Sequence, residues 1–213
     1  MKPIAFTLIL LCLFTSACNR TPAGEKTFDD MTRQPAEDPG LLVERYKDFK
    51  KITPENISND LFMINNRWML VSAGRDSNFN TMTASWGGFG TAWSKPVAFM
   101  LIKNTRYTFE FLQKDSVYTL SFFDKKYRDT LQMLGSKSGR DFDKIKKSGF
   151  TPLRMPSGAM SFKEADLVIE CKKLLSQPID TSNITSSDVM NWYREEPGVH
   201  NIFFGEIIGV WKK

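Results

Sequence analysis

The pattern of apolar and polar positions is clearest between residues 80 and 108, where it predicts two strands followed by a helix. In the first strand hydroxyl side chains alternate with larger apolar ones, and a period of two places the two kinds on opposite faces. One face is therefore expected to pack on the core while the other presents a row of hydroxyls. The hydroxyls belong to Thr81, Thr83 and Ser85, and the alternating side chains to Met82, Ala84 and Trp86.

The rest of the chain follows the same logic. Runs rich in β-branched and aromatic residues predict strands, and apolar residues recurring every three or four positions predict helices. Many short strands with intervening helices indicate a mainly β domain, a small barrel with helical caps, rather than a parallel βαβ sheet. Strands are expected at 68–73, 80–86, 97–102, 117–123, 159–162, 167–174 and 200–210, and helices at 41–49, 108–114, 124–134, 141–148 and from about 185.

Local signals predict where these elements begin and end. A hairpin is expected across residues 74–78, a turn at Gly87 and Gly88, and a loop over 59–66. Thr105 is expected to cap the helix at 108–114, and the TSSD run at 185–188 fits a capping box. Gly135 and Gly149 are expected to end the two preceding helices.

The amino terminus predicts export. Lys2 precedes an apolar run at 4–14, and small residues at 15–17 lead to Cys18. This resembles a bacterial lipoprotein signal, so we expect a signal peptide at 1–17, a lipidated Cys18, a flexible tether at 18–40 and one domain at 41–213. Thr15 stands where such signals usually have leucine, which leaves a plain secretory signal as the alternative. The expected location is the cell envelope, periplasmic or associated with the outer membrane, with membrane contact only through the lipid.

Composition narrows the function. A chain of 213 residues with 41% hydrophobic residues suffices for one domain. The net charge of +5 comes from interspersed residues, a pattern that argues weakly for small anionic ligands and against nucleic acid. With Cys12 and Cys18 in the export signal, Cys171 is left without a disulfide partner, and its apolar neighbours favour a buried structural role. No spacing of His, Cys or carboxylate residues predicts a metal site, and no glycine-rich motif predicts a Rossmann or P-loop nucleotide site.

The helix start after residue 103 has the chemistry of a phosphate site. Free N–H groups, the positive end of the helix dipole and the cations Lys103 and Arg106 all favour an anion there. A solvated helix start with surface cations is the alternative.

Three motifs in this order resemble those of a known family. The strand reads N-x-M-T-x-S-W at 80–86, the helix start reads K-x-x-R-Y-T-x-E at 103–110, and S-G-R-D-x-D-K follows at 138–144. The chain thereby resembles the flavin reductase-like, FMN-binding split β-barrel family, and most closely its flavoredoxin-type members, over roughly 61–210.

The resemblance implies a noncovalently bound FMN, with NAD(P)H as an expected donor, in a homodimer. The 80–86 strand would lie beside the flavin, and the 103–108 step would hold its phosphate. Ser138 and Arg140 would lie near the site or the dimer contact, and His200, the only histidine, near the flavin, with a structural hydrogen bond as its alternative role. The implied contacts are Thr81, Met82, Thr83, Ala84, Ser85, Trp86, Lys103, Arg106, Tyr107, Thr108 and Ser138.

An exported protein conflicts with the usual reductase activity, because little NAD(P)H is met outside the cytoplasm. We therefore expect an FMN-dependent redox protein that transfers hydride or electrons, with the flavin carrying the chemistry and no acid or base residue assigned. One alternative is an electron-transfer flavoprotein without NAD(P)H activity. Another is a lipoprotein that captures flavin, or another anionic aromatic ligand, without turnover.

Overall fold

The computed structural model describes residues 45–58, 60 and 63–213. The expected signal peptide, the lipidated Cys18, the tether and the first part of the 41–49 helix lie outside the described residues. No helix in the described ranges is long and apolar enough to span a membrane. From Arg45 the chain makes a helical turn, with Phe49 N–H donating to the carbonyl of Tyr46, and is extended by Lys50, so the predicted helix is shorter at its carboxyl end.

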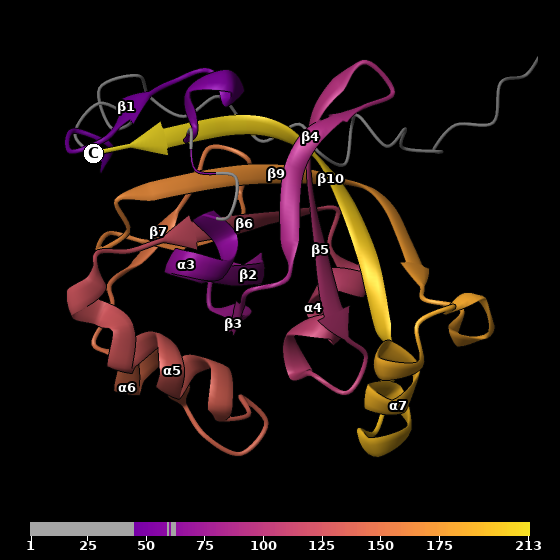
Figure 1. The fold of residues 1–213 in the computed structure, drawn as a ribbon. Coiled ribbons are helices and arrows are strands. Elements are labelled where there is room, and N and C mark those ends of the chain that lie inside the picture. Colours follow the sequence, from indigo (N-terminus) through magenta and orange to yellow (C-terminus); the bar gives the residue numbers. More distant parts are fainter. Residues whose placement is uncertain (1–44, 59, 61–62) are drawn as a thin grey trace, which may run out of the picture. The chain divides into compact units, whose positions relative to one another are not determined.

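An antiparallel eight-stranded sheet forms the centre of the described chain (Figure 1). Seven strands run in the order β3-β2-β6-β9-β10-β5-β4, and β1 pairs with β10. A separate pair, β7 and β8, lies off this sheet. The strands are β1 (Lys50–Lys51), β2 (Met69–Arg75), β3 (Asn78–Ala84), β4 (Gly87–Ala92), β5 (Lys95–Lys103), β6 (Val117–Phe122), β7 (Pro152–Arg154), β8 (Met160–Phe162), β9 (Leu167–Pro178) and β10 (His200–Lys212).

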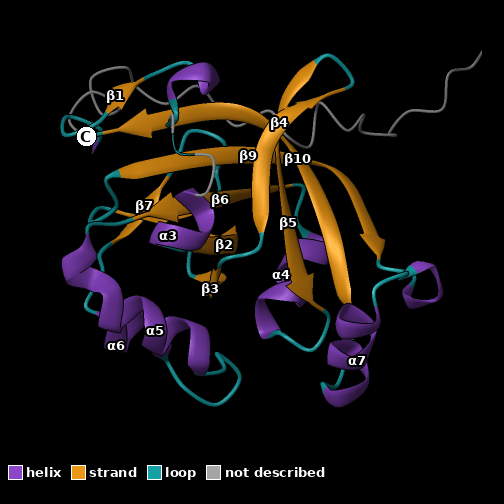
Figure 2. Cartoon of the chain, viewed as in Figure 1, coloured by secondary structure: helices purple, strands orange, loops and turns teal. Residues whose placement is uncertain are grey.

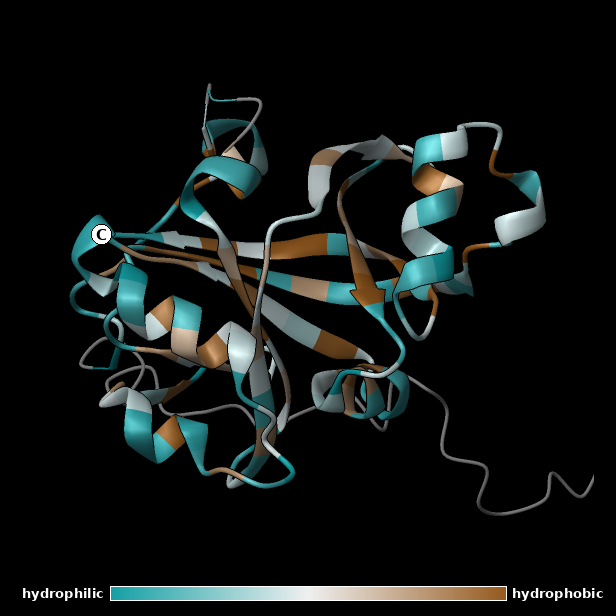
Figure 3. Cartoon of the chain, turned by 60° about the horizontal axis from the view of Figure 1, so that its bottom comes forward, coloured by the Kyte–Doolittle hydropathy of each residue, from teal (hydrophilic) through white to brown (hydrophobic). Residues whose placement is uncertain are grey.

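Helices complete the described part of the chain, and in the view of Figure 2 the α-helices after residue 100 lie below or beside the long strands. The α-helices carry both hydrophilic and hydrophobic segments (Figure 3), as expected of helices that cover a sheet. They are α3 (Met63–Arg67), α4 (Tyr107–Lys114), α5 (Arg128–Ser136), α6 (Lys144–Ser148) and α7 (Ser187–Glu195), with 3₁₀ turns at Pro54–Asn56, Lys125–Tyr127 and Thr181–Asn183.

The sheet is buried on both faces, so successive residues of β2 pack into two different core clusters. Met69, Val71 and Ala73 belong to one core cluster, whereas Leu70 belongs to a second cluster on the opposite face. The first cluster lies beneath α4, through Leu112, and the second beneath α5, through residues such as Leu131 and Leu134. Helices α4 and α5 are thus held at opposite faces of the same sheet edge.

The hairpins set the register of this edge. β2 pairs with β3 from Met69 opposite Ala84 to Arg75 opposite Asn78, which confirms the predicted hairpin. The chain then leaves β3 and pairs β4 with β5, from Gly87 opposite Met100. The predicted turn at Gly87 and Gly88 is wrong, because these residues begin β4; the turn falls at Trp93 and Ser94, both with positive φ.

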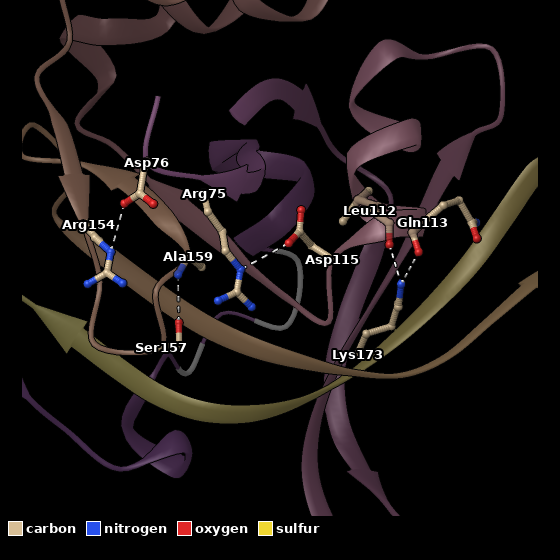
Figure 4. A network of polar contacts seen from close by, with 9 residues as sticks. All are labelled: Arg75, Asp76, Leu112, Gln113, Asp115, Arg154, Ser157, Ala159 and Lys173. Carbon is tan, nitrogen blue, oxygen red and sulfur yellow. Dashed lines mark hydrogen bonds and ion pairs between the residues drawn. The ribbon is translucent and has the colours of Figure 1, made fainter. Parts of the chain in front are cut away.

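A polar network fixes the far end of α4 (Figure 4). The Lys173 ammonium on β9 donates to the carbonyls of Leu112 and Gln113, 2.6 and 3.0 Å away. A cation at a helix carboxyl end satisfies unpaired carbonyls and complements the dipole. Asp115, just after the helix, pairs with Arg75 on β2 at 3.3 Å. These contacts tie the carboxyl end of α4 to β9 and β2.

Two further expectations need correction. Residues 59–66 were expected to be a loop, but α3 begins at Met63, since Met63 and Ile64 are both buried in the core. The helix expected at 124–134 starts as a 3₁₀ turn, capped by Asp124, and α5 continues through Gly135 to Ser136. Gly135 is therefore no terminator. A Cβ there would lie 3.1 Å from Cβ of Thr83, so glycine permits close packing of α5 on β3.

Candidate functional site

A wide groove of about 390 Å³ opens where the end of β3 meets the end of β5 and α7. One wall is the strand end itself, and the other is formed by aromatic and charged side chains from the carboxyl-terminal part of the chain. The groove is lined by Met82, Thr83, Ala84, Ser85, Trp86, Leu101, Lys103, Arg106, Trp192, Glu196 and His200.

A small cavity of about 120 Å³ lies next to the wide groove, between the amino end of α4 and the loop after α5. The two spaces share Met82 and Arg106. The small cavity is lined by Met82, Thr105, Arg106, Tyr107, Thr108, Gly135, Ser136, Lys137, Ser138, Gly139, Arg140 and Lys144. Its lining is dominated by residues with hydroxyl or cationic side chains, which are groups that bind phosphates.

Unpaired positive charge faces the small cavity. Arg106 is exposed and has no ion pair within the described ranges. Lys144 is only 3% exposed, and its ammonium donates to the carbonyls of Leu134 and Lys137 at 3.0 and 3.2 Å, with no carboxylate partner in the described part of the chain. Burial, and then the charge of Arg106, lower the pKa of Lys144 to about 8. An anion in the cavity would relieve this repulsion.

Arg140 closes the cavity rather than adding a free charge to it. Its guanidinium donates to the carbonyl of Thr105 at 3.3 Å and pairs with Glu110 at 2.5 Å, while lying over the ring of Tyr107. Gly139 is pressed against the amide of Asn80, where a Cβ would overlap the side chain. The loop 137–140 is thus strapped to the start of α4.

The backbone at the start of α4 supplies further donors. The first N–H groups of a helix have no intrahelical acceptor. The predicted cap at Thr105 is wrong, because Thr105 lies in the turn before the helix and the N-cap residue is Arg106. The Arg106 side chain makes no capping hydrogen bond. Thr108 is buried, and its hydroxyl accepts a hydrogen bond from Asn80 at 2.8 Å. The helix start therefore keeps N–H groups available to a ligand.

An aromatic cluster forms the other wall of the wide groove. The rings of Trp86, Trp192 and His200 lie 5.0 to 5.4 Å apart. Tyr193 follows on α7, with its hydroxyl 3.1 Å from Nδ1 of His200. Helix α7 is the predicted helix, except that Ser186 rather than Thr185 caps it.

Lys103 lines the wide groove and not the small cavity. Its side chain is 8% exposed, pairs with Glu196 at 3.1 Å, and lies over the ring of Trp192 at 4.9 Å. It therefore fastens α7 to the end of β5. Only Arg106, of the two cations expected at a phosphate, reaches the small cavity.

The structure brings together the expected contacts with one exception. Met82 to Trp86, Lys103 and His200 meet in the wide groove, and Tyr107, Thr108 and Ser138 in the small cavity, with Arg106 in both. Thr81 lines neither: it is fully buried, 2.9 Å from the hydroxyl of Ser72, and donates to the carbonyl of Val71. Thr83 lines the groove, but its hydroxyl donates to the carbonyl of Leu131 at 2.6 Å. Of the hydroxyl row, Thr81 is thus engaged by β2 and Thr83 by α5, and Ser85 is left to the groove.

Several lining residues were not expected from the sequence. Lys144 sits within the S-G-R-D-x-D-K motif, but nothing in the local sequence distinguishes it from the neighbouring Lys146 and Lys147. Trp192 and Glu196 belong to the polar segment 176–198, far along the chain, and no local signal links them to the strand end at Trp86. The reach of Lys144 into the core could have been suspected only from its place at the start of a helix that packs on α5.

Comparisons with known proteins identify the family of the chain. The chain matches the family model described as flavin reductase like domain over residues 63–213. None of the curated proteins compared with the chain matches it. Among solved structures, the flavoredoxin of Methanosarcina acetivorans is similar with a TM-score of 0.54 and 22% identity, covering 77% of this chain and 76% of that one.

Other solved structures give the same result. The flavoredoxin of Desulfovibrio vulgaris (Miyazaki F) has a TM-score of 0.54 and 24% identity, with 69% of each chain covered. The FMN-binding domain of a flavin reductases-like enzyme from Shewanella baltica OS155 has a TM-score of 0.56 and 17% identity, covering 77% of this chain and 76% of that one. These likenesses confirm the predicted fold, a mainly antiparallel split barrel with helices. With the match over residues 63–213, the chain belongs to the flavin reductase-like domain family.

Proposed function

We propose that the wide groove and the small cavity together hold one noncovalently bound FMN and that the protein works in redox chemistry. The observation that carries this proposal is that the two spaces share Met82 and Arg106, so that a single ligand can occupy both. The groove of about 390 Å³ is lined by the rings of Trp86, Trp192 and His200 together with charged side chains, which suits a flat ring with polar edges such as flavin. The small cavity has the donors of a phosphate site.

The residues present fit a phosphate monoester. Arg106, Lys144 and the N–H groups at the start of α4 converge on a cavity of about 120 Å³, closed at its far side by the strapped loop 137–140. A dianionic phosphate would offset the repulsion between the two cations. The cavity of about 120 Å³ is small, so we favour the single terminal phosphate of FMN over the diphosphate of FAD.

The chain's own residues bind and orient the cofactor. Arg106 would fix the phosphate with paired donors, Ser85 would offer a hydroxyl to the ring edge or side chain, and Met82 would pack between the two spaces. When bound, the flavin would supply the hydride or electron transfer, which the protein tunes by contacts and solvent exclusion. The open side of the wide groove leaves room for a donor or acceptor.

The electron donor separates a reductase from its alternatives. NAD(P)H would serve a flavin reductase, whereas an electron-transfer flavoprotein would take electrons from another protein. The test is the visible spectrum of the purified full chain with FMN, titrated anaerobically with NADH, NADPH and then dithionite. Bleaching by a nicotinamide supports the reductase; bleaching by dithionite alone supports the electron carrier or a flavin-capturing protein. If added FMN gives no bound flavin, every flavin function is excluded.

We also propose a homodimer. The rings of Trp93 and Phe99 lie 6.0 and 5.7 Å from that of Phe204, and the three form an outer apolar face of the sheet, on which Trp93 is 62% exposed at the β4–β5 turn. Phe204 on β10 pairs across the sheet with Phe99 on β5 and Leu175 on β9. Apolar surface of this kind is typical of protein contacts. A second copy of this chain is the occupant proposed here.

For location, we propose lipidation at Cys18 and residence in the cell envelope. The support is the amino-terminal sequence pattern alone. Exchange of Cys18 for alanine should release the protein from the membrane fraction without changing its FMN binding. Equal fractionation of both forms would contradict the lipid anchor and favour a plain secretory signal.

A further inference from the structure

One hydrogen bond at the wide groove joins two residues to which the proposed function gives no role. The Tyr193 hydroxyl on α7 lies 3.1 Å from Nδ1 of His200, at the start of β10. His200 is 7% exposed and lines the groove. Its other ring nitrogen, Nε2, makes no hydrogen bond with the described residues. The imidazole is therefore fixed at Nδ1 by Tyr193, and its Nε2 is available to a ligand.

The imidazole is neutral at neutral pH. Burial, and then the positive charges of Lys103 and Arg106, lower the pKa of His200 to about 4. Glu196 is the carboxylate nearest in the groove lining, and it is engaged by Lys103 at 3.1 Å. A neutral imidazole carries a single proton, on Nδ1 or on Nε2, and its hydrogen-bond partner decides which.

Tyr193 decides the position of that proton. Burial raises the pKa of its hydroxyl, which therefore stays protonated. The hydroxyl has no second hydrogen-bond partner within 45–58, 60 and 63–213. A phenol O–H is a stronger acid than a neutral imidazole N–H, so the bond runs from Tyr193 to Nδ1. The His200 proton is then on Nε2.

We infer that Tyr193 is a positioning residue, which holds His200 as an Nε2–H donor to an acceptor atom of the ligand in the wide groove. The rings of Trp86 and Trp192, 5.0 and 5.4 Å from the imidazole, restrict its rotation. This inference rests on the proposed function, under which the acceptor is a carbonyl oxygen or ring nitrogen of the flavin. The polar segment 176–198, which carries α7, thus serves the site by orienting the histidine.

A single histidine makes the first test direct. In the full chain labelled with ¹⁵N-histidine and free of flavin, NMR at pH 7 will show one imidazole without an assignment problem. We expect a proton on Nε2 and a bare Nδ1, and we expect Tyr193→Phe to weaken this preference and give a mixture of the two tautomers. A proton on Nδ1, an imidazolium at pH 7, or a preference unchanged in Tyr193→Phe would overturn the inference.

The second test adds FMN to the same samples. Binding should shift the Nε2 resonance, and Tyr193→Phe should weaken FMN binding about fivefold, the equivalent of one neutral hydrogen bond. His200→Gln, whose amide nitrogen replaces Nε2, should keep most of the affinity, whereas His200→Asn, whose amide replaces Nδ1, should not. Thermal unfolding of each variant reports loss of fold separately.

The outcomes separate this inference from the proposed function. If FMN does not bind the unmodified chain, the proposed function fails, and with it the flavin as acceptor, while the first test still decides the role of Tyr193. If FMN binds but the Nε2 resonance does not move, the proposed function stands and the donor role of His200 is wrong.

Discussion

Arg106 is the residue on which the proposed phosphate site depends most. It lines both spaces and lacks an ion pair within the described ranges, so its charge is available to a ligand. We expect Arg106→Ala to weaken FMN binding by about 1.5–3 kcal/mol, which is roughly 10- to 150-fold, because charged hydrogen bonds are lost. Quenching of flavin fluorescence measures the affinity.

Arg194 offers a matched control for this substitution. It is exposed on α7, outside both spaces, and its guanidinium contacts only the side chain of Asn191, at 3.2 Å, within the described residues. Arg194→Ala should leave the affinity unchanged. If both alanine variants bind FMN as the unmodified chain does, Arg106 is not a phosphate ligand.

The lowered pKa of Lys144 leads to a prediction for how FMN binding depends on pH. With its pKa at about 8 in the free protein, Lys144 is charged below pH 8, and a bound dianionic phosphate raises that pKa. Above pH 8 binding must therefore take up a proton, so affinity should fall with rising pH, by at most about tenfold per unit. Below about pH 6 the phosphate itself is protonated, so affinity should peak between these limits.

Riboflavin supplies the control for this pH profile, since it lacks the phosphate. Its affinity should show no loss above pH 8 from this cause, and Lys144→Met should remove the loss for FMN as well. A profile for FMN that runs parallel to that of riboflavin would contradict the placement of Lys144 beside the phosphate.

At the scale of elements, the loop between α5 and α6 acts as the wall of the small cavity. Because a Cβ on Gly139 would overlap the amide of Asn80, we expect Gly139→Ala to push the loop away from α4. FMN affinity should drop several-fold while riboflavin affinity changes little. Gly90→Ala, where a Cβ would meet nothing within 4 Å, is the control in equilibrium binding. Equal FMN affinity in both variants would show that the loop does not form the cavity wall.

Much of this edge could be predicted from the sequence, because its signals are local. Alternation along 80–86 indicated β3, and apolar periodicity at 108–114 indicated α4. The alternation could not show that β3 is covered on both faces. The burial of Thr81 depends on the opposed hydroxyl of Ser72, and that of Thr83 on the carbonyl of Leu131 in α5. Both partners are brought in by the tertiary fold.

Long-range packing also explains why some residues that line the site could not be predicted from the sequence. Trp192 meets Trp86 only because α7 folds back to the end of β3, and Lys144 reaches the cavity only because α6 packs behind α5. The motif of residues 138–144 indicated that this segment lies near the site, but it did not show which of its side chains would point into the cavity. Arg140, the more obvious cation, is used to fasten the loop.

At the scale of the whole molecule, the outer apolar face predicts self-association. Phe204→Glu places a charge among apolar rings, 5.7 Å from the Phe99 ring centroid in the present contact, so a dimer built on this face should dissociate. Sedimentation velocity should then report a dimer for the unmodified chain and a monomer for the variant.

Val189→Glu serves as the matched control for the dimer, because Val189 is 47% exposed on α7 and lies outside the outer apolar face. It should leave the dimer intact. A monomeric unmodified chain, or a Phe204→Glu variant that sediments as a dimer, would contradict the proposed association through this face.

The most direct test of the account is the affinity of the full chain for FMN compared with riboflavin, measured at pH 7 by quenching of flavin fluorescence. The two-part site predicts one FMN per chain and at least about tenfold weaker binding of riboflavin, since the phosphate contributes charged hydrogen bonds. Equal affinities would contradict the phosphate site, and no binding of either flavin would contradict the proposed function.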